Sequence, residues 1–211
     1  MIIALFGASG RLGQCVIESA TAAGHTLRLH YRAKPSENVP EFSTVVVGRL
    51  DDPTAVREVL RGADAAVVVL GHKPDARVPY IADATKLVVS TMKTLGQSRL
   101  LVVTGAMVGH EKGPVGIGMR LLSMVVRSRT ADGMMEDRDE QERRVKASHL
   151  DGWTVIKPPR LSDGPVGDVD AGATQGVGLR SSVSRKALAK FIVQELEAPQ
   201  FSQQVVYVAG R

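Results

Sequence analysis

GASGRLG, residues 7–13, directly follows the apolar run IIALF, residues 2–6, and this opening decides how the chain folds. A buried strand that ends at Gly7 and continues as a helix near Arg11 leaves backbone N–H groups unpaired at the helix N-terminus. Such a terminus attracts phosphate, and the Ser9 hydroxyl can donate to phosphate or cap the helix. The stretch predicts a diphosphate-binding strand–turn–helix unit; an ordinary glycine-rich turn is the alternative.

The three glycines of this stretch have different expected roles. Gly7 allows the tight turn, Gly10 leaves room for phosphate groups, and Gly13 lets the helix pack closely on the strand. This spacing favours a dinucleotide as the ligand.

The composition is that of one compact domain. The chain has 211 residues, of which 44% are hydrophobic, and this is enough for a substantial core. No apolar stretch approaches the length of a membrane span, and no basic region precedes the first apolar run. We therefore expect a cytoplasmic protein with no membrane partner.

The net charge of +5 raises the question of nucleic-acid binding. Basic residues are interleaved with acidic ones, as in EDRDEQERRVK at residues 136–146, and aromatic residues make up only 4% of the chain. This run is typical of a solvated helical face. We expect no nucleic-acid partner.

Strand and helix patterns alternate along the chain, which predicts a doubly wound α/β fold. Its sheet is a mainly parallel Rossmann sheet with helices on both faces, in a single domain over residues 1–211. The expected strands are 2–6, 26–31, 44–47, 65–70, 100–103, 153–156 and 205–208, and the expected helices are 12–23, 53–60, 78–95, 131–148 and 184–197. The Gly/Pro/Asp-rich segment 158–178 is too polar and broken for core structure, so 158–183 is either a C-terminal substrate-side flap or a long surface connection.

Ligands of open parallel sheets bind outside the carboxyl ends of the strands, so the residues that follow each strand are candidates. Besides the glycine loop, we expect one cleft to collect Arg32, Arg49, Leu50, Gly71, Thr104, Gly105 and Pro158.

Arg32 bears on which dinucleotide is bound. A carboxylate after the second strand would accept hydrogen bonds from a free ribose diol, whereas a cation suits the 2′-phosphate of NADP. Arg32 has Lys34 close by and no acidic residue before Glu37. The pattern favours NADP(H) over NAD(H), and two solvated charges are the alternative.

These motifs resemble the NAD(P)H-binding proteins of the atypical short-chain dehydrogenase/reductase family, which includes biliverdin reductase B, also called flavin reductase, and proteins similar to NmrA. The resemblance covers nearly the whole chain. It rests on GASGRLG, LHYR ending at Arg32, VVVG at 45–48, VVVLG at 67–71, VVTGA at 102–106, KPPRL at 157–161 and SRKALAKFI at 184–192.

The resemblance implies a role for individual residues. Those that it assigns are Ser9, Gly10, Arg11 and Leu12 in the phosphate loop, Arg32 at the 2′-phosphate, Leu50 and Gly71 around adenine and its ribose, and Thr104 and Gly105 beside the nicotinamide. Two positions depart from it, because Arg49 stands where relatives often have Asp, and Gly105 where the flavin reductase has Ser.

Arg49 has two interpretations: it stacks on adenine or adds to 2′-phosphate binding, or it is a solvated arginine. Asp51 is expected to cap the helix that begins near Pro53, although it can also replace the missing carboxylate.

The sequence lacks the tyrosine and lysine, four positions apart, that carbonyl-reducing members of the wider superfamily use. The residues four positions after Tyr31, Tyr80 and Tyr207 are Pro35, Ala84 and Arg211. The histidines show no metal-ligand spacing and the lone cysteine offers no thiolate cluster, so we expect no metal site. No GxSxG motif is present, so we expect no serine nucleophile of that type.

Hydride transfer to a flavin, a quinone or a similar planar acceptor needs positioning more than a dedicated acid. We therefore expect an NADPH-dependent reductase with no assigned catalytic acid. Thr104 and Gly105 would position the nicotinamide, Met107 and Val108 would line the acceptor cavity, and Arg160 would orient an anionic group; packing and surface roles are the alternatives. A non-catalytic NADP-sensing or partner-binding protein and an epimerase-like enzyme also remain open.

Overall fold

The computed structural model describes residues 1–35, 39–71, 80–109, 113–129 and 133–211. Within these residues the main sheet has the strand order β3-β2-β1-β4-β5-β6-β10-β8. Its strands are β1 (Ile2–Phe6), β2 (Thr26–Tyr31), β3 (Thr44–Val47), β4 (Ala65–Val68), β5 (Arg99–Val103), β6 (Gly152–Lys157), β8 (Val169–Gly172) and β10 (Gln204–Gly210). All described neighbours pair in parallel except β8, which runs antiparallel to β10.

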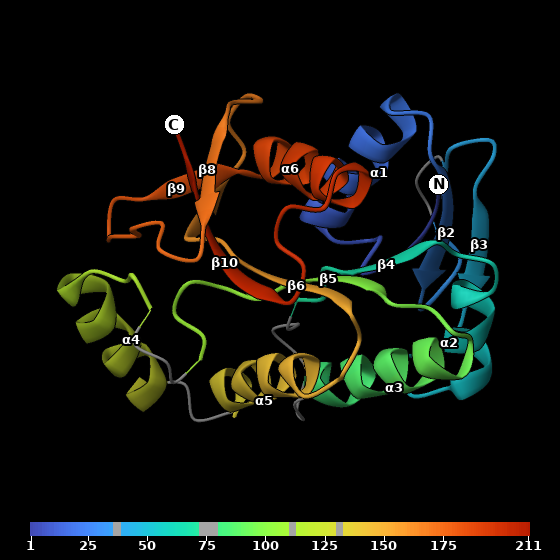
Figure 1. The fold of residues 1–211 in the computed structure, drawn as a ribbon, viewed down its shortest axis with the longest axis horizontal. Coiled ribbons are helices and arrows are strands. Elements are labelled where there is room, and N and C mark those ends of the chain that lie inside the picture. The colour runs from blue at the N-terminus through green and yellow to red at the C-terminus, as the bar shows by residue number, and fades with distance from the viewer. Residues whose placement is uncertain (36–38, 72–79, 110–112, 130–132) are drawn as a thin grey trace.

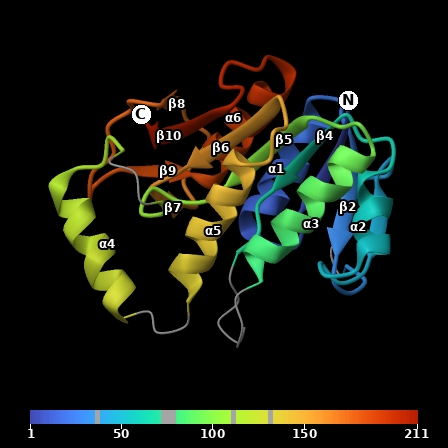
Figure 2. The same cartoon turned by 60° about the horizontal axis from the view of Figure 1, so that its bottom comes forward.

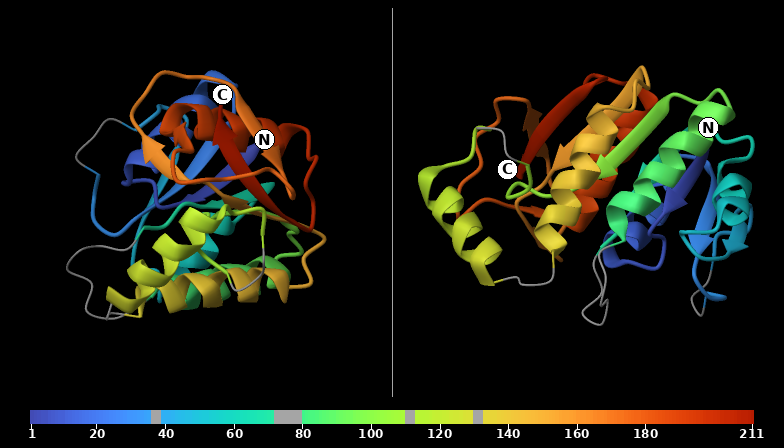
Figure 3. Two further views of the ribbon diagram at one scale, coloured as in Figure 1. Left: turned by 90° about the vertical axis from the view of Figure 1, so that its left-hand side faces the viewer. Right: turned by 90° about the horizontal axis from the view of Figure 1, so that it is seen from below.

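Helices cover both faces of the sheet, as Figure 1 shows. One face carries α1 (Arg11–Ala22) and α6 (Arg185–Glu197), and the other carries α2 (Pro53–Leu60), α3 (Ile81–Thr94) and α5 (Met134–Lys146). The latter three lie side by side in the right view of Figure 3. This arrangement confirms the predicted doubly wound α/β fold.

Helix α4 (Ile117–Arg129) stands apart from the sheet, beyond α5, as Figure 2 shows. The short strands β7 (Arg160–Ser162) and β9 (Ser182–Ser184) pair with each other in a second, two-stranded sheet. Among the described residues, no helix is both long and apolar enough to cross a membrane.

Strand β1 explains why the core has two halves. Successive side chains of a strand point to opposite faces, so Ile3 and Leu5 pack toward α1 and α6, whereas Ala4 and Phe6 pack toward α2 and α3. Each of these four residues is fully buried. A central parallel strand is covered by helices on both faces, so its sequence is expected to be a short, continuous apolar run.

Most predicted elements agree with the structure. The strands at 2–6, 26–31 and 44–47 and the helix at 53–60 have the predicted bounds, and the strand predicted at 65–70 ends at Val68. Helix α3 begins at Ile81 after Tyr80, its N-cap. The predicted starts of the helices at 78–95 and 131–148 lie outside the described residues.

The expectation that 158–178 contributes no core structure is wrong for β8, which forms the edge of the main sheet. An edge strand pairs on one side only, and the VDAG sequence of β8 is only half-buried, so it lacks the apolar run of a central strand. The sequence patterns also missed α4, β7 and β9.

Candidate functional site

A cavity of about 240 Å³ lies at the carboxyl ends of β1, β2 and β4. Its described lining contains six of the predicted cofactor residues, namely Gly7, Ser9, Gly10, Arg32, Leu50 and Gly71. It also contains His30, Val69, Leu70 and Tyr80. The structure therefore brings together residues from five separate stretches of the chain, as expected for a ligand site of a parallel sheet.

The glycine loop is shaped by two close backbone contacts. Gly7 has a φ of +103°, and a Cβ atom there would lie 2.7 Å from the carbonyl oxygen of Val69. A Cβ atom at Gly13 would lie 2.1 Å from the carbonyl oxygen of Gly7. Both positions require glycine because any side chain would meet backbone atoms.

Gly10 differs from the other two glycines because space is open around it. In the part of the chain that the structure describes, the one contact within 4 Å of an added Cβ would be the Gly7 carbonyl oxygen, at 3.3 Å. Gly10 is also the N-cap of α1 and supplies no side-chain cap, so the first N–H groups of the helix are available to a ligand. An open glycine at an uncapped helix N-terminus fits a dinucleotide diphosphate.

The neighbouring residues Arg11 and Leu12 do not line the cavity. The exposed Arg11 side chain forms an ion pair of 3.3 Å with Asp163, and Leu12 packs in the core. A role for these two residues in cofactor binding is thus confined to their backbone N–H groups and stays a prediction.

Arg32 and Arg49 occupy different surroundings. Arg32 is exposed and lines the cavity. Arg49 instead donates from Nε and Nη2 to the two carboxylate oxygens of Asp51, at 2.9 and 2.7 Å, and these hydrogen bonds lower the pKa of Asp51. Arg49 is not among the described lining residues, so its proposed contact with the cofactor stays a prediction.

The cap of α2 is Asp52 rather than Asp51. The Asp52 carboxylate accepts a hydrogen bond of 2.8 Å from the backbone N–H of Thr54. Because Pro53 is the first helical residue, the cap must be the residue immediately before it, which corrects the expectation for Asp51.

His30 and Tyr80 were not singled out from the sequence, although both line the cavity. His30 is 4% exposed and lies against Phe6, with 5.8 Å between ring centroids. The Tyr80 hydroxyl donates to the carbonyl oxygen of Gly71 at 2.7 Å, and burial raises the pKa of Tyr80. The position of His30 near the end of a buried strand, two residues before Arg32, was the available signal.

Helix α5 hydrogen-bonds to segments that lie beside the cavity. Arg138 donates to the carbonyl oxygens of Leu70, at 2.6 Å, and Val103, at 3.4 Å, where β4 and β5 end. Burial lowers the pKa of Arg138 to about 10, so the side chain is still charged at neutral pH. The Asp137 carboxylate accepts hydrogen bonds from the first N–H groups of α3, including 2.9 Å from Ile81.

The expectation that residues 136–146 form a solvated helical face holds for Glu136, Arg143 and Lys146, which are exposed, but is wrong for the other side of the helix. Asp137, Asp139, Gln141 and Glu142 are buried. Their polar groups are satisfied by distant elements, as where Gln141 Nε2 donates to Thr85 Oγ1 at 3.0 Å. A charged helix can be buried when each of its charges meets a partner.

Thr104 and Pro158 follow β5 and β6 and join the two strand ends. The N–H of Thr104 donates to Ile156, at 3.0 Å, and that of Ala106 donates to Pro158, at 2.8 Å. The Thr104 Oγ1 atom is buried and has no hydrogen-bond partner within the described part of the chain. Such an atom suits a ligand group, although neither residue lines the 240 Å³ cavity.

The remaining positioning candidates lie around this loop. A Cβ atom at Gly105 would approach Val108 Cγ2 no closer than 3.8 Å, so this position has room for a side chain. Met107 is half-buried, Val108 is buried, and Arg160 is exposed on β7. Their roles toward an acceptor stay predictions.

A buried ion pair holds the same loop against α5. Lys157 Nζ lies 2.9 Å from the Glu142 carboxylate and also donates to the Val108 carbonyl oxygen. One turn earlier on α5, the Asp139 carboxylate accepts from the N–H of Gly109 at 2.6 Å. The loop that follows β5 is thus fixed by charged groups rather than by apolar packing alone.

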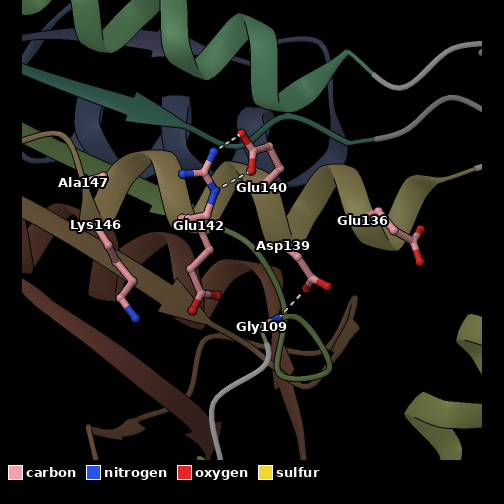
Figure 4. Close-up of a pocket in the computed structure, with 8 residues that line it drawn as sticks. Gly109, Glu136, Asp139, Glu140, Glu142, Lys146 and Ala147 are labelled. Atoms are coloured by element: carbon pink, nitrogen blue, oxygen red, sulfur yellow. Dashed lines mark hydrogen bonds and ion pairs between the residues drawn. The ribbon is translucent and has the colours of Figure 1, made fainter.

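A larger cavity of about 630 Å³ lies beside α5, and Figure 4 shows its acidic wall. Its carboxylates come from Glu136, Asp139, Glu140 and Glu142. Hydrogen bonds from Arg143 and Arg144 lower the pKa of Glu140 to about 2. Arg143 and Lys146 also line this cavity, and none of the predicted cofactor residues is among its described lining residues, so the smaller cavity is the better dinucleotide site despite its size. Within the described residues, no three His, Cys, Asp or Glu side chains gather to hold a metal ion.

Comparison with known proteins agrees with this geometry. Residues 7–199 match the model of the NAD(P)H-binding family. Three solved structures share the fold. One is ChuY, an anaerobilin reductase from Escherichia coli O157:H7, with a TM-score of 0.79 and 22% identity over 100% of this chain and 97% of that chain.

The second is a Streptococcus pneumoniae protein whose description as an NADH-flavin reductase is provisional, with a TM-score of 0.75 and 17% identity over 100% of both chains. The third is a short-chain dehydrogenase/reductase from Veillonella parvula, solved in complex with NADP, with a TM-score of 0.78 and 18% identity over 99% of this chain and 94% of that chain. The glycine loop, the order of the sheet and the extent of the family match show that this chain belongs to the NAD(P)H-binding family.

Proposed function

We propose that this protein is an NADPH-dependent reductase that transfers hydride to a flavin, a quinone or a similar planar acceptor. The observation that carries the proposal is the cavity in which the open Gly10 and the exposed Arg32 meet. Gly10 leaves space for the diphosphate, and Arg32 offers a cation to the 2′-phosphate.

Under this proposal, each part of the cofactor would have a contact on the chain. The backbone of Gly7, Ser9, Gly10, Arg11, Leu12 and Gly13 would hold the diphosphate, and Arg32 would hold the 2′-phosphate. Leu50 and Gly71 line the cavity where adenine and its ribose would lie. The buried Oγ1 of Thr104 and the adjacent Pro158 backbone would support the nicotinamide end.

NADPH supplies the hydride when it is bound, and the protein's part is to orient both reactants. Tyr80 is poorly suited as a proton donor because burial raises its pKa and its hydroxyl already donates to Gly71. A delocalised acceptor ring can take its proton from water instead. Met107 and Val108 would line the acceptor site, and Arg160 would orient an anionic group on it.

Two neighbours support an acceptor of this class, since their descriptions name a bilin and a flavin as substrates. The test is NADPH oxidation measured against a panel of flavins, quinones and dyes. We expect turnover with at least one of these acceptors. Tight NADPH binding without any turnover would favour an NADP sensor, and turnover of a redox-neutral sugar would favour an epimerase.

Replacing Arg32 by alanine should weaken NADPH binding by roughly ten- to a hundredfold, because a hydrogen bond to a charged group contributes on the order of 1.5–3 kcal/mol. NADH, which lacks the 2′-phosphate, should bind almost as before. Fluorescence titration with both cofactors measures the difference. Arg61→Ala is the matched control, since Arg61 is an exposed arginine paired with Glu58 outside the cavity. Equal losses of affinity for NADPH and NADH would contradict the assignment of Arg32 to the 2′-phosphate.

Substitution of Tyr31, Tyr80 or Tyr207 by phenylalanine, one at a time, should leave the rate of acceptor reduction within about tenfold of the parent. Loss of a true general acid typically lowers the rate by about 10²–10⁴. Single-turnover kinetics at saturating NADPH isolate the chemical step. A tyrosine whose loss abolishes that step, with fold and cofactor affinity intact, would be a proton donor and would contradict hydride transfer by positioning alone.

A further inference from the structure

His30 occupies a special place in the cavity wall. It lies near the end of β2, where its backbone is in register with Phe6 of β1 and Val46 of β3. The ring packs against Phe6, the residue is 4% exposed, and it lines the cavity together with Arg32. The imidazole is therefore a buried polar group beside the cation that we assign to the 2′-phosphate.

The two ring nitrogens of His30 have different partners. One hydrogen bond joins the ring to the backbone of Gly48 and favours the charged ring, as expected when a ring N–H donates to a carbonyl oxygen. Nε2 has no hydrogen-bond partner within the described residues, so Nδ1 is the donor. Nε2 is itself buried, so the neutral ring keeps an unpaired lone pair there, whereas the protonated ring would carry an N–H donor in need of an acceptor.

We propose that His30 completes the 2′-phosphate site as a proton-linked group, which is neutral in the free protein and takes up a proton when NADPH binds. This inference rests on the proposed function. A phosphate oxygen accepts hydrogen bonds and carries negative charge, so it favours the protonated ring at Nε2. The free 2′-hydroxyl of NADH can donate to the neutral ring and requires no proton.

The surroundings of His30 favour the neutral ring while no anion is bound. Burial, and secondarily the positive charge of Arg32, hold the pKa of His30 below its ordinary value of 6.5. The adjacent strands β1 and β3 carry no titratable side chain.

The other charged and titratable groups near this end of the sheet do not reverse that preference. Tyr80 is neutral because burial raises its pKa, the exposed Arg49 and Asp51 neutralise each other, and the Asp52 carboxylate near Gly48 is engaged by the Thr54 N–H at the start of α2. The phosphate would thus be the anion that stabilises the imidazolium.

The sign of the pH dependence follows from this change in pKa. The pKa of His30 rises on binding, so NADPH affinity falls as the pH rises between the pKa of the free protein and that of the complex. We expect roughly a three- to tenfold loss of NADPH affinity between pH 7 and pH 8. NADH affinity should change less than about twofold over the same range.

Isothermal titration calorimetry of the full chain tests the proposal. Titrations at pH 7.5 in two buffers of different ionisation enthalpy, PIPES and Tris, give the number of protons taken up with NADPH and with NADH. We expect net uptake with NADPH, up to about one proton, and none with NADH. The phosphate cannot be the source, because pairing with Arg32 would make it release protons rather than bind them.

Two variants make the test specific. His30→Asn keeps a polar side chain but does not titrate, so it should lose the proton uptake and the pH dependence. His149→Asn is the matched control, because His149 is exposed, lies outside the cavity, and has a φ of 56° that asparagine tolerates. This control should behave as the parent does.

Each outcome decides a different point. Equal proton uptake by the parent and His30→Asn overturns the role of His30, as does equal uptake with NADPH and NADH in the parent. The second comparison needs no variant and so holds even if His30→Asn fails to fold. Failure to bind either dinucleotide would overturn the proposed function and this inference with it.

Discussion

Replacing Gly10 by valine should abolish binding of NADPH and NADH alike while the protein stays folded. Gly10 has an extended backbone, with φ −79° and ψ 156°, which valine adopts readily. Within the described residues, an added Cβ meets the Gly7 carbonyl oxygen at 3.3 Å, a tight contact that a shift of a few tenths of an ångström relieves, which is a much smaller change than Gly13 would need. The side chain would instead fill the space that the diphosphate needs. Calorimetric titration with each cofactor, together with thermal unfolding by circular dichroism, measures both effects.

Gly13→Val provides the contrast for this experiment. Its Cβ atom would lie 2.1 Å from the Gly7 carbonyl oxygen and 2.9 Å from that of Ala8, so the contact between α1 and β1 must open. This variant should lose stability as well as binding. A folded Gly10→Val protein with parental cofactor affinity would mean that the loop is only a structural turn.

Breaking the buried pair of Lys157 and Glu142 should produce the largest loss of stability. The two side chains are 2% and 5% exposed, so Glu142→Gln leaves an uncompensated ammonium group in the interior. Loss of one partner from a buried pair typically lowers the free energy of unfolding by about 3–5 kcal/mol. Urea denaturation of Glu142→Gln and Lys157→Met measures it.

The exposed pair of Arg143 and Glu140 on the same helix serves as the control, since their side chains are 68% and 31% exposed. Arg143→Met should lower the free energy of unfolding by less than about 1 kcal/mol. The double variant Glu142→Leu with Lys157→Met should recover part of the loss, because it removes both buried charges. A loss below about 1 kcal/mol in both single variants of the buried pair would show that the pair does not hold the loop.

The sheet and the glycine loop could be predicted because their signals are local. Ile2–Phe6 is a short apolar run followed by a glycine, which is typical of a buried strand. The spacing of the glycines in GASGRLG indicates the close backbone contacts of Gly7 and Gly13. The location of Arg32 followed from the end of the second strand. Each of these features is determined by residues that are adjacent in the sequence, so it can be predicted from the sequence alone.

The role of α5 could not be predicted because its signals are not local. From its charge pattern alone, EDRDEQERRVK is predicted to be a solvated helical face. The groups that pair with its buried charges lie far away in the sequence. Asp137 meets the start of α3, Arg138 meets the ends of β4 and β5, and Glu142 meets Lys157. Only the folded arrangement shows that these charges have partners.

The edge of the sheet was missed for a related reason. Strand β8 obtains its hydrogen bonds from β10, about thirty-five residues later in the chain, and needs no apolar pattern of its own. His30 was missed because a histidine in a buried strand looks like a core residue until the cavity beside it is known.

The assignment of the cavity to the adenosine end of NADPH can be decided by a displacement titration. NADPH bound to the unaltered protein is followed by its fluorescence while adenosine 2′,5′-bisphosphate or AMP is added. If Arg32 holds the 2′-phosphate, the bisphosphate should displace NADPH at a concentration at least about tenfold lower than AMP. Displacement by both compounds at equal concentrations, or no NADPH binding at all, would contradict the assignment.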